Sequence, residues 1–128
     1  MTTLGQKFSY PNEVDEVIRR FVEICIDHFK TDDLGVLLIG SASRGELSWS
    51  DDKEGLCIYS DIEFLIVVPK KKLCGLATFE AEVSRLNASL RFGNRFKIDY
   101  VVNSWDGIPT LEKRIIIFDS KQCGIEYG

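Results

Sequence analysis

Apolar residues recur every three or four positions along two stretches of the chain, which predicts two amphipathic helices. The first stretch opens at Pro11-Asn12 and is broken by Thr31-Asp32-Asp33. Its apolar positions are Val14, Val17, Ile18, Phe21, Ile24, Cys25, His28 and Phe29. The second stretch runs from Leu76 to Phe92. Its apolar face carries Phe79, Val83, Leu86 and Leu90. For His28, at the end of the first apolar stripe, a packing or capping role is favoured over a catalytic one.

Shorter apolar or alternating runs predict β-strands. They are Val36 to Ile39, Tyr59 to Val68, Phe96 to Val102 and Ile115 to Phe118. Because side chains alternate faces along a strand, Lys97, Asp99 and Val101 are expected to share one face. The segment from Leu47 to Tyr59 carries the charged sequence D-D-K-E-G at positions 51–55. We expect this segment to be a long surface loop with a charged turn.

Composition limits the classes of protein that the chain can belong to. With 128 residues, 45% of them hydrophobic, it is expected to form one globular domain over residues 1–128. The sequence has no apolar run of roughly 20 residues, as a membrane span needs, and its first residues are not expected to act as a signal peptide. The net charge of −4 argues against a free-standing nucleic-acid binder, because such proteins carry a basic footprint. The four cysteines lack C-x-x-C spacing, which argues against zinc and fits a cytoplasmic location.

Two carboxylates open the second predicted strand. Asp61 and Glu63 are two residues apart, so their side chains are expected to point the same way. Two such charges about 4 Å apart repel by about 4 kcal/mol at an effective dielectric of about 20. The pair therefore needs a cation, a shared proton or full solvation, and oxygen ligands alone suit magnesium first. Gly40-Ser41, at the abrupt end of the first strand, can aim backbone N–H groups at an anion. Together these features predict a site for a nucleoside triphosphate.

The segments Leu38 to Arg44 and Ser60 to Val68 resemble the nucleotidyltransferases of the DNA polymerase beta superfamily. The family signature is Gly-Ser after a strand, then acid-x-acid on the next strand, then a third acid on a later strand. The form G-S-A-S-R followed by S-D-I-E is most similar to the small-molecule members, among them the kanamycin-type aminoglycoside nucleotidyltransferases. The segment between Arg44 and Ser60 is longer than is usual for the family. The resemblance implies an α/β fold, with a small mixed twisted sheet and helices mainly on one face.

The resemblance also implies an activity, in which a nucleotide, AMP in the first instance, moves from an NTP to an acceptor hydroxyl with release of pyrophosphate. Asp61, Glu63 and Asp99 would be the catalytic metal ligands, with magnesium or manganese as cofactor. Gly40, Ser41 and Arg44 would bind the nucleotide's phosphates. For Arg44 the alternative is a solvated surface residue, and for Asp99 an exposed residue on a half-solvated strand.

The acceptor and the partners are not fixed by these residues. Small molecules and proteins both remain possible acceptors. The family's larger enzymes carry a further helical domain, whereas this chain ends at Gly128, soon after its last predicted strand. We therefore expect a homodimer or a helical partner protein to complete the acceptor pocket. Two other functions stay open: a partner-modifying protein of a toxin–antitoxin pair, and a nucleotide-binding module without turnover.

Overall fold

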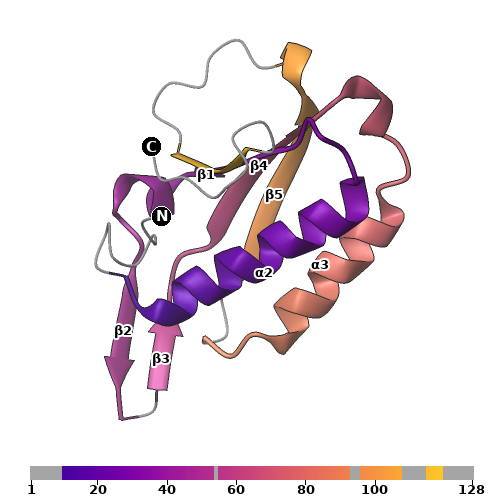
Figure 1. Ribbon diagram of the computed structural model, residues 1–128. Helices are drawn as coiled ribbons and strands as arrows, with labels where there is room; N and C mark the ends of the chain where they lie inside the picture. The colour runs from indigo at the N-terminus through magenta and orange to yellow at the C-terminus, as the bar shows by residue number, and fades with distance from the viewer. Residues whose placement is uncertain (1–9, 54, 93–95, 108–114, 120–128) are drawn as a thin grey trace.

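Four strands form one mixed sheet in the order β5–β4–β1–β6 (Figure 1). Their bounds are β1 Gly35–Ile39, β4 Ile62–Val68, β5 Ile98–Ser104 and β6 Ile115–Asp119. Strand β1 runs antiparallel to both β4 and β6, whereas β4 and β5 are parallel. The computed structural model describes residues 10–53, 55–92, 96–107 and 115–119, so the expected ends of the chain lie outside the described residues. The mixed α/β architecture expected from the sequence is confirmed at this level.

Two helices, α2 (Asn12–Phe29) and α3 (Ala77–Ser89), cover the same face of this sheet (Figure 1). Helix α3 joins β4 to β5, because parallel neighbours need a crossover connection between them. It ends before the predicted Phe92, since Leu90 already has extended backbone angles. No helix in the described part of the chain is long and apolar enough to cross a membrane.

The hydrophobic core lies between these helices and the sheet, and every second residue of β4 contributes its side chain to it. The residues of β4 that face the helices are Ile62, Phe64, Ile66 and Val68, and all are buried. The ring of Phe21 in α2 stacks on Phe64 with 4.2 Å between ring centroids. His28 contacts the rings of Phe29 and Phe79, at 4.8 and 5.3 Å between centroids, which is the packing role expected for it.

The opposite face of the sheet is divided into an apolar part and a charged part. Leu37, Leu65 and Val67 form a second buried cluster, against which Trp105 packs. The Trp105 indole Nε1–H donates to the Asp33 carbonyl at 2.9 Å, which holds the ring in place. Farther along this face of β4, towards the start of the strand, stands Glu63. The apolar cluster therefore fills one end of this face and leaves the other to polar residues.

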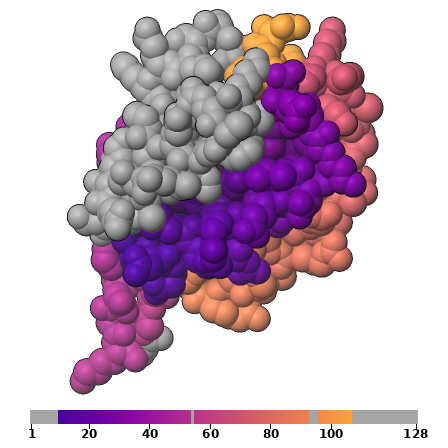
Figure 2. Space-filling model, viewed as in Figure 1, coloured from indigo at the N-terminus to yellow at the C-terminus, as the bar shows by residue number. Residues whose placement is uncertain are grey.

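The expectation of a long loop over residues 47–59 was wrong. The segment forms an antiparallel hairpin of β2 (Trp49–Asp52) and β3 (Gly55–Ile58), which projects from the body of the molecule (Figure 2). Ile58 joins the hairpin to the core, because its side chain is buried and its N–H donates to the Phe92 carbonyl at 2.7 Å. Asp51 and Asp52 therefore lie within β2, whereas Lys53 lies in the turn, where the sequence interpretation placed the charged residues.

Asn87 in α3 holds the start of β5 through both backbone groups of Ile98. The Ile98 N–H donates to Asn87 Oδ1 at 2.8 Å, and Asn87 Nδ2 donates to the Ile98 carbonyl at 3.2 Å. Asp99, a candidate site residue, follows Ile98 in the chain. The Asn87 side chain therefore helps to fix the position of Asp99.

We predict that Asn87→Ala lowers the free energy of unfolding by about 1–3 kcal/mol, because it leaves the buried Ile98 groups without partners. Urea denaturation measures this. Ser84→Ala, at an exposed position of the same helix, is the matched control and should cost nothing. Equal midpoints for the two variants would mean that Asn87 does not hold β5.

Candidate functional site

The candidate site residues lie where β1 ends and β4 and β5 begin. A cavity of about 290 Å³ opens there on the sheet. It is lined by Ile39, Glu63, Phe64, Asp99, Tyr100 and Val101. Two of the three predicted catalytic carboxylates, Glu63 and Asp99, therefore share one cavity, although they are 36 positions apart in the sequence.

Glu63 and Asp99 are direct register partners across the parallel pair β4–β5. Neighbouring strands lie about 4.8 Å apart, and partner residues project from the same face of the sheet. Both side chains are half-buried, so water screens their repulsion only in part. The expectation that the strand bearing Asp99 lies beside the strand bearing Glu63 is confirmed.

Gly40 lies directly against the Glu63 carboxylate. Ile39 is the register partner of Glu63, so the chain turns at Gly40 just beside it. Gly40 has a φ of 72°, and a Cβ atom built on it would lie 2.5 Å from Glu63 Oε2. A side chain at this position would both strain the backbone and displace the carboxylate. The structure therefore joins the Gly-Ser turn to the acidic strand, as the sequence interpretation required.

The turn after Gly40 is a short 3₁₀ helix, η1 (Ser41–Arg44), which contacts β4. The Ser43 hydroxyl donates to the Gly40 carbonyl at 2.7 Å and closes the turn. Ser41, the first residue of η1, is partly buried. Arg44 is exposed, and its Nε lies 3.3 Å from Glu46 Oε2. As placed, Arg44 is a solvated surface residue, and its role in phosphate binding stays a prediction.

Asp61, the third predicted catalytic carboxylate, is not among the residues that line the cavity. It precedes β4 by one residue and so lies outside the strand pairing, which begins at Ile62. Within the described ranges, no three carboxylates, histidines or cysteines gather closely enough to hold a metal ion. The three-acid metal site therefore stays a prediction, with Glu63 and Asp99 as the part that the fold brings together.

Asp99 has a cationic neighbour that the sequence did not indicate as a partner. The Lys97 ammonium lies 3.7 Å from Asp99 Oδ1, with both side chains about half exposed. An exposed pair of this kind contributes only about 0–1 kcal/mol to stability. The alternation of the strand had placed Lys97 and Asp99 on the same face, and this was the sequence feature that could have indicated their ion pair.

Tyr10 was also missed by the sequence interpretation, and its hydroxyl bonds to the backbone of the turn after Gly40. Its hydroxyl donates to the Ala42 carbonyl and accepts from the Leu47 N–H, each at 3.1 Å. Burial, opposed by the bond from Leu47 and reinforced by the charge of Glu46, raises the pKa of Tyr10. No pattern around position 10 could have indicated this, because both partners are backbone groups more than 30 positions away.

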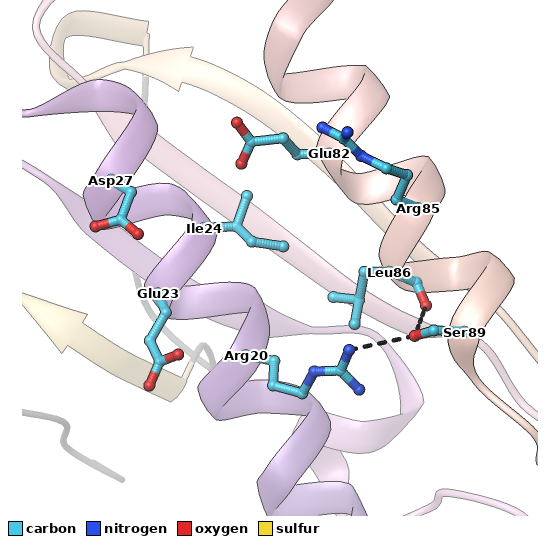
Figure 3. A pocket seen from close by; sticks show the side chains of 8 residues that line it. All are labelled: Arg20, Glu23, Ile24, Asp27, Glu82, Arg85, Leu86 and Ser89. Atoms are coloured by element: carbon cyan, nitrogen blue, oxygen red, sulfur yellow. Dashed lines mark hydrogen bonds between the residues drawn. The ribbon is translucent and has the colours of Figure 1, made fainter.

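A larger groove of about 400 Å³ lies between α2 and α3, on the other side of the sheet (Figure 3). In Figure 3 the Arg20 guanidinium points across the groove and donates to Ser89 Oγ at 3.2 Å. Three acidic and two basic side chains line it, and none of the predicted site residues does. The groove therefore does not compete with the cavity beside Glu63 as a candidate active site.

No family model, curated protein or solved structure matches the chain.

We predict that Gly40→Ala lowers the free energy of unfolding more than Gly75→Ala does. Both glycines have a φ of 72°, but a Cβ atom on Gly75 meets nothing within 4 Å. Both variants carry the strain of a positive φ, about 1–2 kcal/mol, and Gly40→Ala also carries that of a ψ of −157°, a region almost exclusive to glycine. Beyond this strain, about 0.5–1 kcal/mol of the cost of Gly40→Ala should come from contact with Glu63 and should vanish in a Glu63→Ala background. Thermal denaturation of the four variants measures it, and an equal cost of Gly40→Ala with and without the Glu63 side chain would contradict the contact.

Proposed function

We propose that this protein is a metal-dependent nucleotidyltransferase of the fold its sequence resembles, moving a nucleotide from an NTP to an acceptor hydroxyl. The observation that best supports this is the meeting of three separate segments at one cavity. Gly40 lies against Glu63, and Glu63 is paired with Asp99. This is the order and placement of groups that the resemblance to the polymerase beta superfamily implies.

The side chains present fit magnesium or manganese. All the candidate ligands are carboxylates, and magnesium is commonly held by one or two carboxylates together with substrate phosphates. Glu63 and Asp99 supply such a pair, and Asp61 would complete the set. When bound, the ion would neutralise charge on the phosphates and on the attacking and leaving oxygens.

The residues of the chain then have separate roles in the transfer. The Ser41 hydroxyl and the backbone at Gly40 would hold the terminal phosphates, with Arg44 assisting. Asp99 would accept the proton of the acceptor hydroxyl while the oxygen of that hydroxyl forms a bond to the α-phosphorus. The bond from that phosphorus to the bridging oxygen breaks, and pyrophosphate leaves. Before substrate binds, Lys97 would offset the charge of Asp99.

The acceptor side of the cavity is open in the described part of the chain, since Val101 at its rim is 56% exposed. We propose that a second copy or a helical partner protein covers this side in a cytoplasmic complex. The acceptor itself would be a small molecule or a protein that presents a hydroxyl.

A first test concerns the metal. Nucleotide affinity should be at least about tenfold higher with magnesium than with excess chelator, because the phosphates share the coordination of the ion. Calorimetric titration with ATP measures both affinities. The same affinity in both conditions would rule out the metal-dependent site.

A second test separates function from stability. Glu63→Gln should remove the magnesium-dependent gain in ATP affinity while leaving the melting temperature unchanged or slightly raised, since it relieves repulsion with Asp99. Asp51→Asn, on the exposed hairpin, is the control and should keep the full gain. A markedly lower melting temperature for Glu63→Gln would mean that the carboxylate is structural.

A further inference from the structure

Tyr10 connects the body of the protein to the turn that carries Ser41. Its side chain is only 6% exposed, and its single oxygen joins two backbone groups on either side of the end of η1. The Ala42 carbonyl accepts its hydrogen bond, and the Leu47 N–H donates to it. Both of these residues are buried, so no water replaces the hydroxyl if it is lost.

Within the described turn, no backbone hydrogen bond joins Ala42 directly to Leu47. The Glu46 N–H donates to the Ser41 carbonyl at 2.9 Å, and the Gly45 N–H reaches the Ala42 carbonyl only at 3.5 Å. Gly45 has a φ of 74°, a conformation that costs other residues energy. The closure between Ala42 and Leu47 therefore depends on the hydroxyl from position 10.

We propose that Tyr10 is a positioning residue, which sets the affinity for the terminal phosphates of a nucleotide by holding the Ser41-bearing turn in shape. This inference rests on the proposed function. Tyr10 itself is buried and touches no ligand. It acts through the backbone from Ala42 to Leu47, which directly follows Ser41 in the turn. Because burial favours the protonated phenol, the donor to Ala42 is retained at neutral and mildly alkaline pH.

The test is calorimetric titration of Tyr10→Phe with ATP and with AMP, both in the presence of magnesium. The Phe ring keeps the packing of Tyr10, and the hydrogen bonds to Ala42 and Leu47 are lost. We expect affinity for ATP to fall about tenfold, the scale of one buried hydrogen bond. Affinity for AMP, which lacks the terminal phosphates, should stay within about twofold of the wild type. Tyr59→Phe, which removes a hydroxyl bonded to Ser50 on the exposed hairpin, is the matched control and should bind both nucleotides normally.

A second variant guards against a folding defect in Tyr10→Phe. Gly45→Ala strains the same turn at an exposed position, because Gly45 has a φ of 74°, and it should show the same selective loss of ATP affinity. Amide hydrogen exchange at Leu47 should accelerate in Tyr10→Phe and not in Tyr59→Phe. Accelerated exchange with unchanged ATP affinity, or equal losses for ATP and AMP, would overturn the positioning role alone. A wild-type protein that binds no nucleoside triphosphate would overturn the proposed function, and the role of Tyr10 with it.

Discussion

The parallel pairing of β4 with β5 determines where the candidate carboxylates lie. Glu63 and Asp99 meet because the two strands run in the same direction in one continuous register. The apolar residues that alternate along β4 fix that register, since they fill the core beneath α2 and α3. A slip of one residue would turn Glu63 into this core, where an unpaired carboxylate costs several kcal/mol. The hydrophobic core therefore sets the position of the polar site on the opposite face.

Contacts from outside the sheet then hold the segments that enter the site. Asn87 of α3 holds the start of β5, and Tyr10 holds the turn after β1. Trp105 packs on the apolar half of the second face, whereas Glu63, on the other half, lines the cavity. Each of these side chains bonds to backbone, so they determine the geometry of the site and leave its chemistry to other residues.

The sequence predicted those parts of the structure that depend on local pattern. Helical spacing predicted α2, and the apolar runs predicted β1, β4 and β6, because burial of one stripe or face leaves a clear period. The hairpin was missed because its strands are only four residues long and two aspartates occupy one of them, so charge obscured the alternation.

Contacts between distant segments could not be predicted in the same way. The sequence placed Glu63 and Asp99 on neighbouring strands only through the family resemblance, whereas the structure also pairs them in register. The approach of Gly40 to Glu63 and the bonds of Tyr10 depend on how three segments pack together. For Asp61 the local pattern pointed to a strand residue, because it is spaced two positions from Glu63. In the structure the pairing of β4 with β5 begins one position later, at Ile62.

The most direct test of the account is to follow the α-phosphate of ATP. The protein would be incubated with ATP labelled at the α or the γ position, magnesium, and a panel of hydroxyl-bearing small molecules and proteins. The account predicts that the α label moves to an acceptor, that the γ label leaves as pyrophosphate, and that Glu63→Gln abolishes both. Transfer of the γ label to an acceptor, or an α label that stays on the nucleotide with every acceptor, would contradict it.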